Sequence, residues 1–559
     1  MSGNLNSSIR KLTNTFILCF LILSGVAAYI QVDGRAFFNG PVLSAAAYSP
    51  ARTCPPYDSP VRGKIFDRNG NLIAESVPDS SYTCGYKRVY AQWVVDTGLA
   101  PLIGYFSFRY GASGIEQTYN DQLSNTGTGQ TLSDARAKLL HLPRYGNDLY
   151  LTIDKNVQEA AARYYDSSAF HGGVCESTAN PPGSITVEDP KTGEILAMVS
   201  FPAYDPNQIV QADSSVSTTA TTGIQYWQSL NANGAVPRLL NRASQGLYDP
   251  GSTFKTVTLL AAIDSGKFAL NSQFDFNQAT NFQVPSGETI KWYDYFNGTW
   301  SGILDANSFP LTLQQGYAYS DNVIYARASV GVGAQTWLKY AGALGIATPS
   351  GNFASLQFDA PAATSTTFVT LANGQPEPFT NDLLAESGFG QGHLAISPLT
   401  MAGVASVVAS GGYLYQPHVV RKVVPADQSV KAILPINDGI AIGGGPVVQA
   451  STAQDAQRAM ASVVEQGTAY WGMVRNGQHI IDTGTYMGAK TGTGQLHVGN
   501  PQAWFLSYAP DLQEPGASSQ SWGPFAVVVQ KEHGGEGACQ AFVANDIYPF
   551  LKTYPIPAA

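Results

Sequence analysis

Charged residues are scarce in this chain of 559 residues, since Asp, Glu, Lys and Arg together make up 13% of it. That share is about half the one typical of globular proteins. The formal net charge is −9. An acidic chain with few cations lacks the basic surface that binds nucleic acid, so we expect no nucleic-acid partner. An anionic substrate would have to be held by a few cations placed at one site.

Cysteine and histidine are also sparse, with five cysteines and seven scattered histidines. Their spacing matches no metal-binding pattern, so we predict neither a metal nor another cofactor. One cysteine, Cys19, lies in an apolar stretch near the N-terminus. The others are Cys54, Cys84, Cys175 and Cys539. In an oxidising compartment four cysteines form two disulfides in one of three pairings, of which we favour Cys54–Cys84 with Cys175–Cys539.

Only one apolar run approaches the length of a membrane span. Residues 16–32 are almost wholly apolar and follow Arg10 and Lys11. The pattern predicts a single-pass anchor at residues 12–32, with residues 1–11 in the cytoplasm and the rest of the chain outside the cell membrane. The alternative is a cleaved signal peptide, because Val26-Ala27-Ala28 is a tolerable cleavage site.

The chain beyond the anchor divides into two predicted domains. Residues 62–76 read as a β-hairpin, in which Asn69-Gly70 supplies the tight turn. Short, glycine-punctuated pieces continue to residue 147, which predicts a small N-terminal pedestal domain at 33–147. The character changes at Asp148, and residues 148–559 form a second, larger predicted domain.

Strand and helix patterns in residues 148–559 predict an α/β (α+β) domain with a mostly antiparallel sheet flanked by helices. Expected strands are 149–153, 184–188, 195–201, 487–495, 503–508 and 525–530. Expected helices are 156–165 after Asp154, 252–265, and 398–410 with Ser397 as the N-cap and Gly411 beyond its end. No internal repeat is present.

The stretch Pro250-Gly251-Ser252-Thr253-Phe254-Lys255 is the strongest candidate for a nucleophile. Ser252 and Lys255 are three residues apart, so a helix places both side chains on one face. A serine hydroxyl needs an adjacent base to act as a nucleophile at neutral pH. A buried lysine can lose its proton and serve as that base.

Two further motifs follow in order: Ser320-Asp321-Asn322 and Lys490-Thr491-Gly492-Thr493. Each motif has similar copies elsewhere in the chain. The copies are Ser8 with Lys11, Ser2-Gly3-Asn4, Ser350-Gly351-Asn352 and Lys191-Thr192-Gly193. The copy at Lys191 falls in a predicted hairpin turn and continues with Glu194, where an anion site would need a hydroxyl. The copy at Lys490 falls in a predicted strand and continues with Thr493.

The ordered set of three motifs is the signature of penicillin-binding proteins and class A β-lactamases. The chain resembles the class B penicillin-binding proteins, the D,D-transpeptidases that cross-link peptidoglycan, over nearly its whole length. Supporting segments are 62–70, 151–154, 200–207, 241–243, 390–392 with 397–399, and 466–469. Residues 88–90 and 104–110 resemble the actinobacterial penicillin-binding protein A type. The resemblance implies the penicillin-binding transpeptidase, or serine β-lactamase-like, fold with a small β-rich dimerisation-type domain before it.

The resemblance also implies a role for each matching residue. Ser252 would attack the D-Ala-D-Ala carbonyl of a stem peptide, or a β-lactam, to form an acyl-enzyme, with Lys255 as the base. Ser320 would relay a proton, and Asn322 would bind the substrate amide and hold Lys255. Lys490 would be a catalytic residue that adds positive potential, and Thr491, Gly492 and Thr493 would bind the substrate with its terminal carboxylate. The amides of Ser252 and Thr493 would form the oxyanion hole. We expect Asp321 to point away from the site and to take no part in catalysis.

The part of the chain before residue 148 is too short for a glycan-polymerising domain. The resemblance therefore implies a partner that supplies glycan strands, a SEDS-type membrane polymerase.

Three alternatives share these motifs or the location. A serine β-lactamase would hydrolyse its acyl-enzyme, but no glutamate-bearing deacylation loop is recognisable. A non-catalytic scaffold of wall synthesis would not need Lys255, and a β-lactam sensor would need a cytoplasmic signalling domain before the anchor. A Ser-His-Asp hydrolase is excluded by the lack of a Gly-x-Ser-x-Gly motif.

Overall fold

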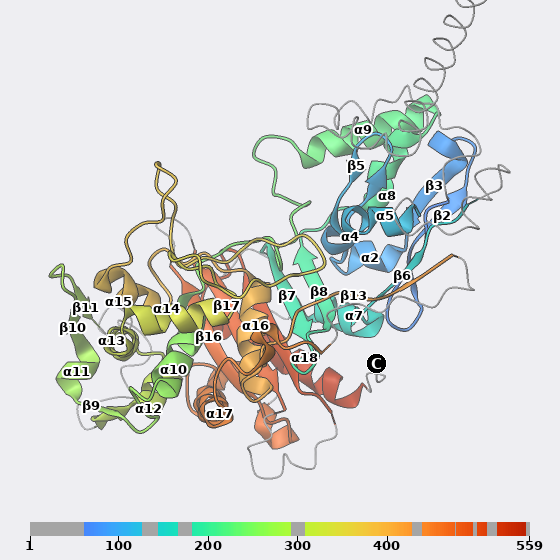
Figure 1. Ribbon diagram of the computed structural model, residues 1–559. Coiled ribbons are helices and arrows are strands. Elements are labelled where there is room, and N and C mark those ends of the chain that lie inside the picture. Colours follow the sequence, from blue (N-terminus) through green and yellow to red (C-terminus); the bar gives the residue numbers. More distant parts are fainter. Residues whose placement is uncertain are drawn as a thin grey trace, which may run out of the picture.

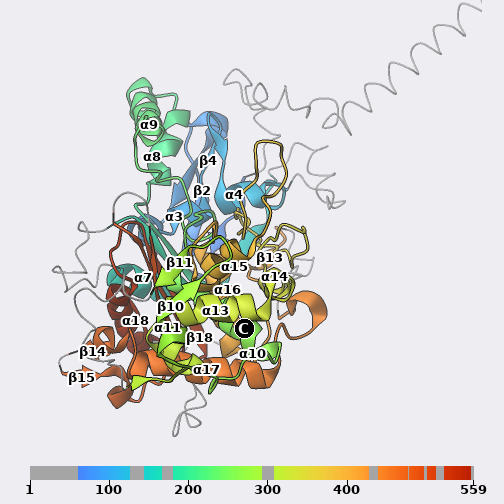
Figure 2. The same cartoon turned by 90° about the vertical axis from the view of Figure 1, so that its left-hand side faces the viewer.

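The structure is a computed structural model that describes residues 61–125, 144–165, 181–291, 308–426, 439–475, 477–495, 500–510 and 522–554. Figure 1 shows two lobes, and the predicted catalytic motifs all lie in the larger one. The smaller lobe combines the N-terminal strands with α8 (Pro206–Val210) and α9 (Ser217–Leu230). The view turned by 90° places α8 and α9 beside the N-terminal strands again (Figure 2).

A five-stranded antiparallel sheet in the order β16-β17-β18-β7-β8 is the centre of the larger lobe. Its strands are β7 (Gly183–Glu188), β8 (Ile195–Phe201), β16 (Gly488–Gly494), β17 (Gln502–Ala509) and β18 (Phe525–Lys531). The five corresponding sequence predictions and the antiparallel arrangement are confirmed. Thr186 of β7 lies opposite Val528 of β18, so the sheet joins the beginning and the end of the catalytic region.

Helices cover both faces of this sheet. Helix α16 (Pro398–Ala409) packs on β7, β17 and β18, and α17 (Ala450–Glu465) packs on β16. On the opposite face, Tyr548 of α18 (Ala541–Thr553) makes a hydrogen bond with Ser507 of β17. Neighbouring residues of a strand point to opposite faces of the sheet. Ser507 therefore faces α18, and Leu506 faces the helices on the other side. Lys490 lies opposite Leu506 in the ladder and therefore belongs to the face covered by α16 and α17.

The remaining elements of the larger lobe complete these layers. The helices are α7 (Lys155–Tyr164), α10 (Lys255–Asp264), α11 (Phe276–Thr280), α12 (Leu313–Ala318), α13 (Asn322–Val332), α14 (Ala334–Ala343) and α15 (Asn381–Phe389). The short strand pairs are β9 (Gln273–Phe274) with β12 (Leu311–Thr312), β10 (Asn281–Gln283) with β11 (Thr289–Lys291), and β14 (Val474–Arg475) with β15 (Gln478–His479).

The predicted helix starts agree with the structure. The Asp154 carboxylate accepts hydrogen bonds from the amides of Asn156 and Val157 at the start of α7. The Ser397 hydroxyl accepts from the Thr400 amide at the start of α16, where proline occupies the first turn. Such caps satisfy backbone donors that have no partner within the helix. The predicted helix 252–265 differs in one respect: its first turn is a 3₁₀ turn, η4 (Gly251–Phe254), and the α-helix begins at Lys255.

The smaller lobe is organised around a second sheet, in the order β13-β6-β1-β2-β3. Its strands are β1 (Ile65–Phe66), β2 (Leu72–Pro78), β3 (Tyr86–Tyr90), β6 (Asp148–Leu151) and β13 (Val420–Val424). The predicted hairpin is the antiparallel pair β1–β2. Strand β6 pairs in parallel with β1 and antiparallel with β13, so the sheet extends across residue 147, where the sequence predicts a domain boundary. Short elements complete the lobe: β4 (Phe106–Ser107), β5 (Gly111–Ala112), α2 (Gln92–Asp96), α3 (Ala100–Ile103), α4 (Gly114–Thr118) and α5 (Asn120–Leu123).

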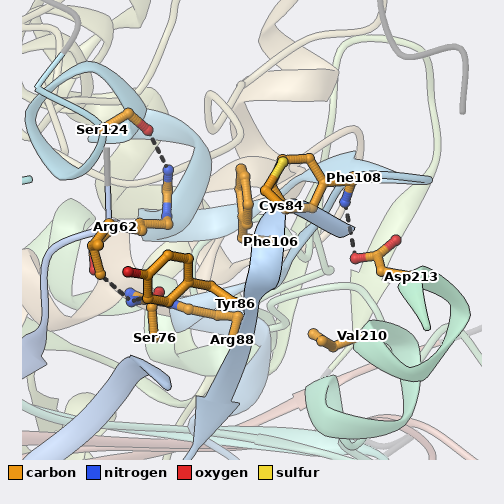
Figure 3. Close-up of a pocket in the computed structure, with 11 residues that line it drawn as sticks. Arg62, Ser76, Cys84, Tyr86, Arg88, Phe106, Phe108, Ser124, Val210 and Asp213 are labelled. Carbon is orange, nitrogen blue, oxygen red and sulfur yellow. Dashed lines mark hydrogen bonds between the residues drawn. The ribbon is translucent and has the colours of Figure 1, made fainter. Parts of the chain in front are cut away.

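A buried ion cluster joins distant parts of the smaller lobe. The Glu116 carboxylate accepts hydrogen bonds from Arg62 and Arg88, and all three side chains are buried. These arginines lower the Glu116 pKa against the effect of burial, so Glu116 is ionised. The cluster lies beside a cavity of about 140 Å³ (Figure 3). Asp213 lines the same cavity, and its carboxylate accepts the Phe108 amide. The cavity contains no residue of the predicted catalytic motifs.

The structure describes only two of the four cysteines in the predicted disulfides. Cys84 and Cys539 are both disulfide-bonded. Cys19, Cys54 and Cys175 lie outside the described residues, so the favoured pairing stays a prediction. The predicted tail at 1–11 and anchor at 12–32 lie outside them too. Among the helices that the structure describes, none has both the length and the apolar character needed to cross a membrane.

Candidate active site

Ser252 lies in η4, between the sheet and α10. Ser252 is 8% exposed, so its hydroxyl lies in closely packed surroundings. The preceding glycine has φ +51°, and a Cβ at Gly251 would come within 2.5 Å of the Thr493 carbonyl. Only glycine therefore allows the turn to approach β16 this closely.

Lys255, the first residue of α10, is fully buried and contacts its predicted partners Ser252 and Asn322, and Ser320 in addition. Its Nζ donates to Ser252 Oγ at 2.7 Å and to Asn322 Oδ1 at 2.7 Å. The same atom lies 2.9 Å from the Ser320 carbonyl and 3.2 Å from Ser320 Oγ. Burial lowers the Lys255 pKa to about 7, and the nearby Asp321 carboxylate opposes this change. A lysine with this pKa is neutral in an appreciable fraction of molecules at neutral pH and can accept a proton.

Ser320 connects the two lysines of the site. Its backbone has φ +61°, an uncommon conformation for a residue with a side chain. This conformation lets its carbonyl and its hydroxyl both reach Lys255, while the Oγ also accepts a hydrogen bond from Lys490 Nζ at 2.8 Å. Helix α13 begins two residues later, at Asn322. The geometry gives a continuous hydrogen-bonded chain from Ser252 through Lys255 and Ser320 to Lys490.

Asp321 lies at the start of α13, and its predicted lack of a catalytic role stays a prediction. Its carboxylate accepts the amides of Val323 and Ile324 and thereby caps α13. The side chain is fully buried, and burial raises the Asp321 pKa to about 7. Its charge acts on Lys255, although the structure shows no hydrogen bond between the two side chains in the described residues. Asp321 thus caps α13 and lies close enough to Lys255 to influence its pKa.

The third motif forms the edge strand β16. Lys490 is fully buried, and burial together with the charge of Lys255 holds its pKa well below the usual value. The Thr491 hydroxyl makes a 2.6 Å hydrogen bond with the Thr468 hydroxyl. Thr493 Oγ1 accepts the Gly537 amide at 3.2 Å. A Cβ at Gly492 would meet the Pro250 carbonyl at 2.7 Å, so this glycine allows β16 to pack against the turn that carries Ser252.

The structure separates these motifs from their described copies. Lys191-Thr192-Gly193 lies in the turn between β7 and β8, where Lys191 donates its amide to Asp189. Ser350 lies in a loop after α14 and contacts Thr348. Neither copy contacts Ser252 or Lys255. The copies at Ser8 and Ser2 lie outside the described residues.

Two glycine-containing segments that the sequence analysis did not place in the site support it directly. A Cβ at Gly390 would lie 1.7 Å from the Gly251 carbonyl, so the backbone of Gly390 packs directly against the turn that carries Ser252. A Cβ at Gly467 would lie 2.3 Å from the Ala318 carbonyl, and the next residue, Thr468, reaches Thr491. Their signal in the sequence was the pair of short motifs at 390–392 and 466–469.

The arrangement is suited to nucleophilic catalysis by serine. A hydroxyl is hydrogen-bonded to a lysine of lowered pKa, and a second lysine lies at the edge of a strand beside two threonines. Among the described residues, no group of three histidine, cysteine or acidic side chains is arranged to hold a metal.

Comparison with known proteins defines the class. The family described as the penicillin binding protein transpeptidase domain matches residues 183–548, more than half of the chain, and the chain belongs to that family. The penicillin binding protein A dimerisation domain matches residues 62–148.

Individual relatives cover almost the entire chain. The peptidoglycan D,D-transpeptidase PbpA of Mycolicibacterium smegmatis is 29% identical over 537 residues, which cover 95% of each chain. PbpA of Mycobacterium tuberculosis is 27% identical and covers 90% of this chain and 91% of its own. A solved structure of M. tuberculosis penicillin-binding protein A as an imipenem acyl-enzyme has a TM-score of 0.69 at 24% identity, covering 88% of this chain and 98% of the other. This last likeness shows that the fold is shared.

Proposed function

We propose that this protein is a peptidoglycan D,D-transpeptidase that cross-links stem peptides through a Ser252 acyl-enzyme and is acylated there by β-lactams. The observation that carries the proposal is the 2.7 Å contact between Ser252 Oγ and Lys255 Nζ inside a network that also includes Ser320, Asn322 and Lys490. The membership of the transpeptidase family and the two PbpA relatives support it.

In the acylation step, neutral Lys255 takes the Ser252 proton as the oxygen attacks the carbonyl of the penultimate D-Ala. The proton then reaches the leaving D-Ala amine through Ser320, which contacts both lysines. The leaving amine departs and the acyl-enzyme ester remains.

The negative charge that develops on the carbonyl oxygen is stabilised by the backbone amides of Ser252 and Thr493. Each such donor contributes about 3–4 kcal/mol to transition-state stabilisation. Lys490 and the hydroxyls of Thr491 and Thr493 hold the terminal carboxylate, and Gly492 keeps the strand close to the turn. Asn322 orients Lys255 and the substrate amide.

The proposed location of the protein depends on its N-terminal segment. We propose a single-pass anchor at residues 12–32, a pedestal domain at 33–147, and a transpeptidase domain at 148–559 outside the cell membrane. The partner would be a SEDS-type glycan polymerase. The hydropathy of residues 16–32 supports the anchor. Extraction of membranes with alkaline carbonate tests it: the full chain stays in the pellet and a chain that begins at residue 33 does not.

Intact-mass spectrometry after incubation with penicillin tests the catalytic proposal. We expect a single stable adduct on the peptide containing Ser252, and no adduct on the Ser252→Ala variant, whose fold is unchanged because only a hydroxyl is removed. Drug consumption without an adduct would identify a β-lactamase. Intact drug without an adduct would identify a non-catalytic scaffold, and an adduct on Ser252→Ala would place the nucleophile elsewhere.

A further inference from the structure

Asp249 is a carboxylate beside the nucleophile that the proposed acylation does not use. It precedes the turn of Ser252 by two residues, and its Oδ1 accepts the Gly251 amide at 3.2 Å. Its carbonyl oxygen accepts Trp504 Nε1 of β17 at 2.9 Å. A Cβ at Gly494 would come within 2.3 Å of that carbonyl, so Asp249 packs against the last residue of β16. These contacts fix the carboxyl group between the nucleophile turn and the end of the edge strand.

The described residues place no cation against this carboxyl. Within the described residues Asp249 takes part in no ion pair, and its Oδ2 makes no hydrogen bond. The two residues at the adjoining end of β16 are the neutral Gly494 and Gln495. The nearby Tyr248 donates instead to Glu532, which is paired with Arg242. Asp249 is only half-buried, so a solute can reach it.

The protonation state of the Asp249 carboxyl is therefore sensitive to a charged ligand. Burial raises the Asp249 pKa to about 7, and only the Gly251 amide opposes the rise. A cation bound to the free oxygen would favour the ionised form and supply the missing charge.

The second half of a transpeptidation requires a group that binds the acceptor ammonium ion and takes a proton from it, and a carboxylate can do both. The acceptor amine reaches the acyl-enzyme as an ammonium ion at neutral pH, because alkylammonium groups ionise near pH 10.4. In this form it cannot attack a carbonyl. The site already contains two lysines, Lys255 and Lys490, and both repel an ammonium ion when they are protonated. Asp321 is fully buried under α13 and cannot meet the acceptor.

We propose that Asp249 binds the ammonium group of the acceptor stem peptide and receives its first proton. This inference rests on the proposed transpeptidase function and names the acceptor side of the same site: a chain that presents a primary amine close to Ser252.

The proposed step balances. The ammonium ion gives one proton to the Asp249 carboxylate and becomes a neutral amine. The amine attacks the ester carbon of the acyl-enzyme, so a C–N bond forms and the bond to Ser252 Oγ breaks. The nitrogen loses a second proton, which Lys255 passes to the departing Oγ. The proton on Asp249 leaves to solvent, and the free enzyme and the cross-linked amide remain.

The Asp249→Asn variant of the full chain in detergent tests the proposal. The amide oxygen of asparagine can still accept the Gly251 amide, so the turn is retained while the charge is lost. The substrates are a thioester donor ending in D-alanine and an acceptor peptide with a side-chain amine. We expect the acceptor concentration for half-maximal aminolysis to rise about tenfold, and the acyl-enzyme to be hydrolysed instead of transferred.

Three controls separate the outcomes. Acylation by penicillin reports on the first half-reaction without an acceptor, and we expect an unchanged rate in Asp249→Asn. Loss of acylation in the unchanged protein would refute the proposed function itself. Asp249→Glu restores a carboxylate and should recover part of the transfer. Asp96→Asn makes the same chemical change at an exposed site in α2 and leaves the partition unaltered.

An unchanged ratio of aminolysis to hydrolysis in Asp249→Asn at every acceptor concentration would overturn the proposal. An equal loss of acylation and of transfer would also overturn it, because the residue would then serve only to shape the nucleophile turn.

Discussion

At the scale of single residues, the proposed mechanism makes the rate of acylation depend on the protonation of Lys255. Burial brings the Lys255 pKa to about 7. Below that pH the amine carries a proton and cannot accept the one from Ser252, so we expect the acylation rate to rise as the pH increases through about 7 and to level off above it. Stopped-flow measurement of the acylation rate between pH 5.5 and 9 follows this rise, which is the ascending limb of the pH–rate profile. The Lys255→Arg variant remains charged throughout and loses about 10²–10⁴-fold.

The neighbouring Asp321 sets the position of that limb. Its negative charge raises the Lys255 pKa, against the effect of burial. Asp321→Asn keeps an oxygen that can cap α13 and removes the charge, so the limb moves to lower pH. A rate that does not vary with pH in either protein would contradict the assignment of Lys255 as the base.

At the scale of secondary-structure elements, Gly390 determines whether the nucleophile turn keeps its place. The residue ends α15 with φ +97°, and a Cβ there would lie 1.7 Å from the Gly251 carbonyl. Gly390→Ala therefore displaces η4, and we expect acylation by penicillin to fall by at least about tenfold, consistent with the sensitivity of catalysis to small displacements. Gly374→Ala is the matched control: its φ is +78° but nothing lies within 4 Å of the added atom. Equal rates in the two variants would show that backbone conformation alone is responsible.

A second element-scale property lies in the interface between β7 and α16. Glu188 at the end of β7 is buried, and both its carboxyl oxygens lack a hydrogen-bond partner in the described residues. Burial raises the Glu188 pKa to about 8. The folded state therefore retains a proton that the unfolded state loses near pH 4.3.

This difference makes the stability depend on pH. A raised carboxyl pKa means that the folded state binds more protons than the unfolded state between about pH 4.3 and 8, so the free energy of unfolding falls as the pH rises across this window. Glu188→Gln removes the effect, and its advantage over the unchanged protein grows to about 2–4 kcal/mol at pH 8. Urea unfolding at pH 5, 7 and 9 measures it. Glu159→Gln, in an exposed pair with Lys155, is the control, and an equal pH dependence there would refute the explanation.

At the scale of the whole molecule, the smaller lobe depends on a buried charge. Glu116→Gln leaves Arg62 and Arg88 without their carboxylate, and breaking a buried pair in this way destabilises by about 3–5 kcal/mol. We expect urea unfolding to shift accordingly while acylation of Ser252 at 20 °C keeps its rate, because the cluster lies in the other lobe. Glu75→Gln breaks a solvent-exposed pair with Lys64 in the same lobe and costs less than about 1 kcal/mol. Loss of acylation in folded Glu116→Gln protein would instead show that the lobes are functionally coupled.

The connection between the lobes is itself structural. Arg68, from the predicted hairpin, is paired with Glu194 at the start of β8, and both side chains are buried. Strand β13, late in the chain, completes the sheet of the smaller lobe. The smaller lobe is thus tied to the catalytic lobe at several points.

Local patterns in the sequence were sufficient for much of this molecule. The hairpin at Asn69-Gly70, the caps at Asp154 and Ser397 and the five strands of the central sheet depend on neighbouring residues, which is why their positions were predictable. The order and context of the three motifs likewise distinguished Ser252, Ser320 and Lys490 from their copies, because a glycine turn, a helix start and a strand each have a local signature.

Only the tertiary structure decided what these elements do to one another. The pairing of β6 with β13, the support of Gly251 by Gly390, and the placement of Asp321 and Asp249 join residues that are distant in the chain or depend on burial. No local pattern encodes them, since a pKa is changed by desolvation and charge in three dimensions and a glycine is required only where another backbone comes close. The sequence therefore determined which groups are the candidates for the chemistry, and the packing of the fold decided their protonation and their contacts.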